Sequence, residues 1–79
     1  MIKIFAEGED KQTLESWKET CGVSVPVESA SEAAKLNITT LPCIVEANDS
    51  NVTKTYADSI TAVLAFTNEE IAEIIAKSN

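Results

Sequence analysis

Thiol chemistry is the first possibility that the residue types raise, because Cys21 and Cys43 are the two cysteines of a chain without histidine or arginine. A thiol attacks a disulfide as the thiolate, and a neighbouring positive group lowers the pKa of that thiol. Cys43 directly follows Pro42, at the start of an apolar run. Cys43 is therefore the candidate redox thiol, but the absence of histidine and arginine to lower its pKa favours the alternative interpretation, a buried structural thiol.

The first elements that could position these thiols are a strand and a helix. Apolar residues at 2–5 predict a short strand, which a polar turn closes before Asp10. Asp10 has the side chain of a helix N-cap, and Gly22 suits the left-handed residue that ends a helix. The face expected to be buried combines residues at helical spacing: Leu14, Trp17 and Cys21.

A second strand and a short helix are predicted next. Valines alternate over residues 23–27, and Pro26, which has no N–H to donate, indicates that this strand lies at a sheet edge. Ser29 and Glu32 have the spacing of a capping box at the start of the following helix. That helix is expected to break near Asn37.

The middle of the chain predicts a β-hairpin. Pro42–Ala47 and residues 52–56 are rich in apolar or β-branched residues, and the segment 48–51 between them has the composition of a turn. A proline is tolerated at the first residue of a strand, which fits Pro42. The two strands should therefore pair in an antiparallel arrangement.

Two helical segments are predicted to follow the hairpin. Asp58 or Ser59 is expected to cap the first of them. Thr67 and Glu70 have capping-box spacing at the start of the second, which should bury Ile74. The predicted order is β-α-β-α-β-β-α, and the first strand–helix–strand unit should cross over right-handed, so that its strands are parallel.

This order, together with three motifs, resembles the glutaredoxins of the thioredoxin superfamily. The motifs are the opening strand Met1–Phe5, the segment Thr40–Pro42 and the segment Tyr56–Ser59. The resemblance implies an α/β, thioredoxin-like fold, in which a four-stranded mixed sheet is flanked by helices. It also implies a single glutaredoxin-like domain over residues 1–79 and a cis peptide bond before the proline.

The redox motif of that family is missing from this chain. Glutaredoxins carry Cys-x-x-Cys at the start of the first helix, where the backbone N–H groups and the helix dipole favour a thiolate. The matching positions here are Asp10, Lys11, Gln12 and Thr13. A carboxylate suits the same electrostatic setting but does not attack disulfides. We therefore expect Asp10 to be a helix cap and dithiol catalysis to be lost.

The resemblance also implies a set of binding residues. Leu41 and Pro42 match the element whose backbone binds glutathione in the family, and Asp58 with Ser59 match the turn that caps its last helix. Tyr56 replaces a glycine of that turn. Glutathione thus stays open as a ligand, although no cofactor is expected. The candidate binding residues are Asp10, Lys11, Thr13, Leu41, Pro42, Asp58 and Ser59.

We expect the two cysteines to remain separate, reduced thiols. A helix from Asp10 to Cys21 is roughly 16 Å long, which in the resembled fold puts Cys21 at the opposite end of the sheet from Pro42. A disulfide needs Cα atoms within about 7 Å of each other. Two distant cysteines without histidine also have no recognisable metal-ligand spacing.

The charge balance excludes two classes of partner. Thirteen acidic residues against six lysines give a net charge of −7, which repels nucleic acid and anionic lipid headgroups.

The sequence also lacks the patterns of a membrane span and of a signal peptide. No run approaches the roughly 18 apolar residues of a membrane span, and Met1 leads into a strand pattern rather than a signal peptide. We therefore expect a cytoplasmic protein with no nucleic-acid, membrane or metal partner.

Three functions remain open at this point. The first is a glutaredoxin-like, non-catalytic module that binds a protein or peptide partner through the proline loop or the acidic surface. The second is an enzyme, a monothiol thiol-disulfide oxidoreductase that uses Cys43. The third is interference with a regulatory protein by an acidic mimic, for which the net charge is the supporting observation.

Overall fold

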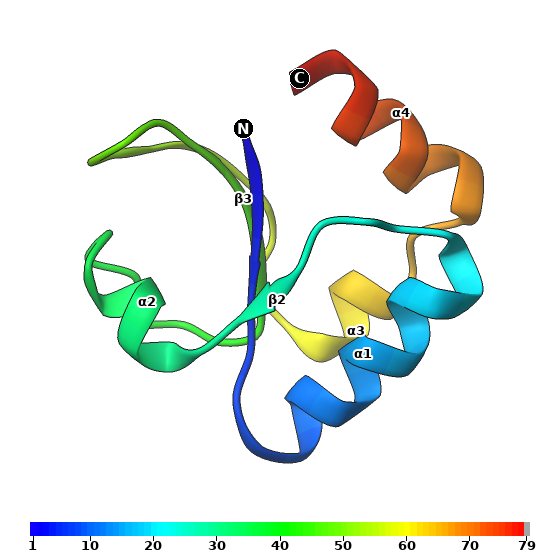
Figure 1. Ribbon diagram of the computed structural model, residues 1–79, viewed down its shortest axis with the longest axis horizontal. Coiled ribbons are helices and arrows are strands. Elements are labelled where there is room, and N and C mark those ends of the chain that lie inside the picture. The colour runs from blue at the N-terminus through cyan, green and yellow to red at the C-terminus, as the bar shows by residue number, and fades with distance from the viewer. Residues whose placement is uncertain (79) are drawn as a thin grey trace.

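A mixed four-stranded sheet with helices on both faces forms the α/β fold of this protein (Figure 1). The computed structural model describes residues 1–78. The elements in chain order are β1 (Ile2–Phe5), α1 (Gly8–Cys21), β2 (Val27–Glu28), α2 (Ala30–Ala34), β3 (Cys43–Ala47), β4 (Val52–Ala57), α3 (Ile60–Leu64) and α4 (Asn68–Ser78).

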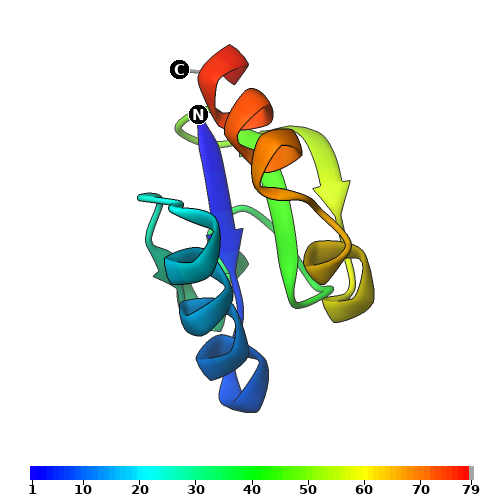
Figure 2. The same ribbon diagram turned by 90° about the vertical axis from the view of Figure 1, so that its right-hand side faces the viewer.

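The strand order is β2-β1-β3-β4, so β1 and β3 are central and β2 and β4 are edges. β1 pairs in parallel with β2 and antiparallel with β3, and β3 and β4 form an antiparallel hairpin. These pairings confirm the predicted parallel first unit, the edge position of the second strand and the hairpin. Figure 2 shows α1, α3 and α4 in front of the sheet, and Figure 1 shows α2 on the opposite side.

Each face of the sheet has its own apolar cluster, because side chains alternate along every strand. On the three-helix face Ile4 and Ile44 pack with Leu14, and all three are fully buried. On the α2 face Phe5 and Cys43 pack with residues of α2 and β3. The core positions predicted at Leu14 and Trp17 are confirmed, whereas Ile74 is only partly buried.

The first helix begins three residues earlier than predicted. Glu7, not Asp10, is the N-cap residue, and Gly8 follows with a φ of 62°, a conformation that glycine adopts readily. The expected capping role of Asp10 is therefore wrong, because its residue already lies in the first helical turn. Its negative charge still lies where the helix dipole favours it. Gly22 ends the helix in the left-handed conformation, as predicted.

The second strand is shorter than the valine alternation predicted. Only Val27 and Glu28 pair with β1. Pro26 has no N–H for the ladder, so regular pairing begins directly after it. Val23 is nevertheless buried in the three-helix cluster, which explains why the sequence alternates before the strand starts.

The capping box predicted for α2 does not form. Ser29 Oγ lies 2.9 Å from Ser31 Oγ, and the Glu32 carboxylate pairs with Lys35 at 3.2 Å. Both side chains are thus engaged elsewhere on the surface. The predicted break is confirmed, because Asn37 is left-handed, with a φ of 61°. The next residue then donates its N–H back to the Ala33 carbonyl, which closes the helix end.

The segment from α2 to β3 ends at the peptide bond between Leu41 and Pro42, which is cis. Pro42 is buried and precedes β3, so the regular strand begins one residue later than predicted. Leu41 is partly buried against the apolar cluster of the α2 face.

The caps of the last two helices form as the spacing predicted. Ser59, rather than Asp58, caps α3, with its hydroxyl accepting the Ala62 N–H at 3.1 Å. At the start of α4 the Thr67 hydroxyl accepts the Glu70 N–H at 3.1 Å. The Glu70 carboxylate accepts the Thr67 N–H at 2.9 Å in return. Reciprocal bonds of this kind satisfy donors that would otherwise lack partners.

Candidate functional site

One end of the sheet brings together the segments that carry the predicted binding residues. Phe5 pairs with Cys43, so Pro42 lies beside the segment that leads from β1 into α1. Ile44 pairs with Ala57, which places Asp58 beside the start of β3. The start of α1, the Leu41–Pro42 bond and the start of α3 therefore lie at the same end of the sheet, the lower end in Figure 2.

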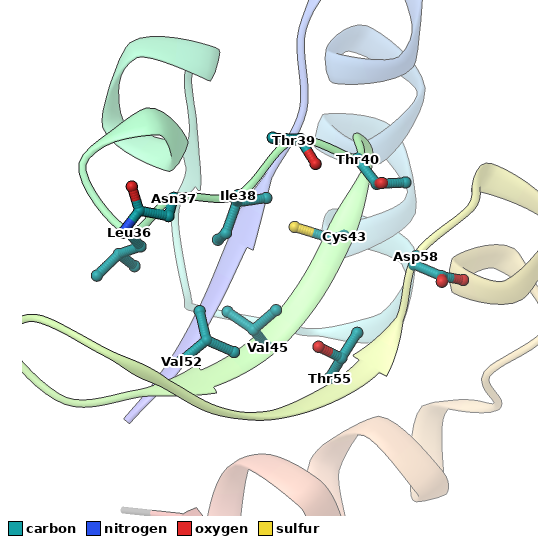
Figure 3. Close-up of a pocket in the computed structure, with 10 residues that line it drawn as sticks. All are labelled: Leu36, Asn37, Ile38, Thr39, Thr40, Cys43, Val45, Val52, Thr55 and Asp58. Atoms are coloured by element: carbon teal, nitrogen blue, oxygen red, sulfur yellow. The ribbon is translucent and has the colours of Figure 1, made fainter.

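A pocket of about 270 Å³ opens at this end, on the α2 face (Figure 3). It lies between the segment that leaves α2 and the surface of β3 and β4. The residues that line it are Leu36, Asn37, Ile38, Thr39, Thr40, Cys43, Val45, Val52, Thr55 and Asp58.

The structure divides the predicted site residues between two sides of the sheet. Cys43 and Asp58 line the pocket. Asp10, Lys11 and Thr13 belong to α1, which packs on the opposite face (Figure 1). The remaining three, Leu41, Pro42 and Ser59, lie at the same end of the sheet without lining the pocket.

Several pocket residues escaped the sequence reasoning. Val45 faces the pocket because it shares a strand face with Cys43, and this alternation is visible in the sequence. Thr55 lies opposite Val45 in the hairpin register, which also places it on that face. Thr39 and Thr40 reach the pocket only because the chain reverses at Asn37 and returns over the sheet.

Cys43 lies in the pocket wall as a neutral thiol. Its residue is only 2% exposed. The pKa of the thiol is raised to about 11, mainly because the group is buried. A hydrogen bond from the Phe5 backbone lowers this pKa, and the negative charge of Asp58 raises it. At neutral pH the sulfur therefore behaves as a small apolar group. These properties favour the structural interpretation of Cys43 over the redox interpretation.

The start of α1 offers hydroxyl and carboxylate groups in place of thiols. The Thr13 hydroxyl is already used, since it donates to the Glu9 carbonyl at 3.1 Å. Asp10 is half-buried in the first helical turn. The Ser59 hydroxyl is likewise occupied by its capping bond. The Thr13 and Ser59 hydroxyls thus bind nearby backbone, and neither they nor the Asp10 carboxylate is a nucleophile towards disulfides.

Both cysteines are free, as predicted. Cys21 is the last residue of α1 and is half-buried, whereas Cys43 is buried at the start of β3. The length of α1 separates Cys21 from the end of the sheet where the pocket lies.

Within residues 1–78, no helix has the length and apolar character needed to cross a bilayer. In the same range, no three side chains of histidine, cysteine, aspartate or glutamate gather as a metal ion would require. Comparisons of the chain with protein-family models, curated proteins and solved structures gave no match.

Proposed function

We propose that this chain is a glutaredoxin-like protein of the thioredoxin superfamily that binds a protein or peptide partner and has no dithiol activity. The mixed four-stranded sheet with helices on both faces is compatible with the fold of that superfamily. The motif resemblance at Leu41–Pro42 and Asp58–Ser59 supports the same proposal, because both segments lie at one end of the sheet.

The observation that carries the proposal is the state of the thiols. The first turn of α1 contains Glu9 and Asp10, where the resembled enzymes have a reactive cysteine. The thiol nearest to this end of the sheet, Cys43, is buried and has a pKa raised to about 11. Thiol-disulfide exchange needs an accessible thiolate, so this arrangement supports binding rather than catalysis.

The edge strand β4 provides a backbone surface for a partner. It pairs with β3 on one side only, and within residues 1–78 no strand pairs with its outer edge. An extended peptide can bind to such an edge through main-chain hydrogen bonds, while alternate side chains enter neighbouring pockets. Val52 and Thr55 of β4 line the pocket, so edge and pocket are adjacent.

The size of the pocket favours a side chain over a cofactor. Small-molecule sites commonly measure about 300–1,000 Å³, and this pocket measures about 270 Å³. One partner side chain fits such a volume better than a whole tripeptide such as glutathione. We accordingly propose no resident cofactor and a cytoplasmic location, where free cysteines such as Cys21 and Cys43 persist.

A disulfide-reduction assay tests the absence of thiol catalysis. Wild-type protein and Cys43→Ser are mixed with a small mixed-disulfide substrate and with insulin, under glutathione-coupled conditions. We expect both proteins to give the uncatalysed rate. Robust turnover by the wild type that disappears in Cys43→Ser would overturn the proposal in favour of the monothiol enzyme.

A capture experiment tests the binding half of the proposal. Tagged wild-type protein is compared with Pro42→Ala at the pocket end and with Pro26→Ala beside the opposite edge strand. We expect a specific partner to be retained by wild type and Pro26→Ala and to be lost with Pro42→Ala. Equal retention by all three proteins would contradict a role for the proline loop.

A further inference from the structure

The pocket has an acidic group at one end. Asp58 is the single charged residue among the described residues that line it. Its side chain is exposed, and none of the ion pairs found within residues 1–78 involves it. The carboxylate therefore has its charge available for a partner.

The opposite end of the pocket is largely apolar. Figure 3 shows Leu36, Ile38 and Val52 at this end, beside the amide of Asn37, and Thr40 with Asp58 at the other end. Cys43 and Val45 lie between the two groups; both are buried, and the Cys43 sulfur is uncharged at neutral pH. A ligand that fills the length of the pocket would pass from an apolar surface to a carboxylate.

Lysine and arginine side chains match this pocket, because each has an aliphatic stem for the apolar end and a cationic head for the carboxylate end. Such stems cover apolar surface while the charged head stays in water or meets an acceptor. The net charge of −7 adds to this complementarity, because it attracts a basic partner at long range. A phosphate or carboxylate ligand would meet repulsion from the same charges.

The pocket is also correctly placed for a side chain of an added strand. Val52 and Thr55 belong to β4, whose outer edge pairs with no strand of residues 1–78. In an extended peptide paired with this edge, every second side chain projects towards the α2 face. One of these side chains would lie over the pocket.

We propose that the pocket receives a lysine or arginine side chain of an extended partner segment that pairs with the outer edge of β4. The aliphatic stem packs against Ile38, Val45 and Val52, and the cationic head lies near Asp58. This inference rests on the proposed partner-binding function and deepens it, because it specifies a basic, extended segment as the partner.

Three capped peptides that differ at one position provide the test. The central residue of acetyl-Thr-Val-X-Val-Thr-amide is lysine, norleucine or glutamate; norleucine keeps the aliphatic stem and lacks the charge. Each peptide is titrated into the full ¹⁵N-labelled chain at low salt and followed by NMR. We expect the lysine peptide to shift the amides of Thr39, Thr55 and Asp58. We also expect it to bind about two- to fivefold more tightly than norleucine, the range of an exposed ion pair.

Matched variants separate the local charge from the overall charge. Asp58→Asn and Asp49→Asn each remove one negative charge, and Asp49, which is exposed in the hairpin turn, does not line this pocket. We expect Asp58→Asn to abolish the preference for lysine over norleucine and Asp49→Asn to retain it.

A third variant, Thr55→Tyr, places a bulky ring at the pocket and should weaken the binding of both peptides. Thr55 is exposed, so the fold should tolerate this change.

Several results would overturn the inference. They are equal affinity for the lysine and norleucine peptides, an unchanged lysine preference in Asp58→Asn, and the absence of amide shifts at the pocket with any peptide. Failure of these peptides leaves the proposed function standing, because the capture experiment with Pro42→Ala tests partner binding without assuming a basic, extended segment. Turnover that depends on Cys43 in the disulfide-reduction assay would instead refute the proposed function itself.

Discussion

The reactivity of Cys43 provides the sharpest quantitative prediction. Replacing Cys21 by serine leaves Cys43 as the single thiol. At pH 8 a thiol with the ordinary pKa of 9.0 is roughly one-tenth ionised, whereas one with a pKa of about 11 is roughly one-thousandth ionised. Because the thiolate is the reacting species, alkylation of Cys43 should be about 100-fold slower than that of a free thiol. Its 2% exposure should slow the reaction further.

The assay is iodoacetamide labelling followed by mass spectrometry between pH 7 and pH 10. The Cys21→Ser protein reports on Cys43, and Cys43→Ser reports on the half-buried Cys21. Labelling of the unfolded Cys21→Ser chain in urea supplies the rate of an unprotected thiol. Native labelling within about threefold of that rate, with a midpoint near the ordinary pKa of 9.0, would refute the argument from burial.

The same raised pKa predicts a loss of stability in alkaline solution. The unfolded thiol ionises near its ordinary pKa of 9.0 and the folded thiol near 11. The folded state therefore holds the proton more tightly. The contribution of Cys43 is fully present below pH 9 and falls as the pH rises towards 11, by about 3 kcal/mol in all. Urea unfolding of Cys43→Ala across this range should show a weaker pH dependence than that of the wild type, and identical slopes would contradict the prediction.

Two stability predictions follow from burial and capping. Leu14→Ala should lower the free energy of unfolding by about 2–5 kcal/mol through cavity formation, because Leu14 is fully buried. Ile74→Ala should cost less, because Ile74 is only partly buried; equal losses in urea unfolding would show that the depth of burial is misjudged. Thr67→Ala should cost about 1 kcal/mol, since it removes one bond of the Thr67–Glu70 pair. Ser29→Ala should leave the thermal midpoint nearly unchanged, and a similar shift in both variants would contradict the difference in capping.

Residue spacing predicted a helix cap correctly where the capping side chains bind backbone groups close to them in the sequence. The capping box of α4 forms because Thr67 and Glu70 are neighbours in the chain, and little else competes for their side chains. The equivalent prediction at Ser29 fails, because Ser31 and Lys35 bind the two side chains instead. Spacing identifies a capping box only when no competing partner lies within reach.

The boundaries of α1 show a different limit of sequence reasoning. Asp10 is a good N-cap residue by type, yet the helix begins at Gly8. A glycine with a φ of 62° lets the chain turn sharply after Glu7 and start the helix earlier. The position of the N-cap therefore depended on the path of the chain between β1 and α1. The helix-capping preferences of single residues do not specify that path.

The sequence by itself determined the absence of a cysteine pair at the first helix, the excess of negative charge and the alternation that gives each strand two different faces. These properties follow from residue identity and spacing, so no distant contact can change them. Tertiary structure alone decided that Asn37 returns the chain over β3 and β4 and that Asp58 lies at the end of the resulting pocket. The physical reason is that the pocket joins segments distant in the chain, and only the packing of α2 on the sheet sets the space between them.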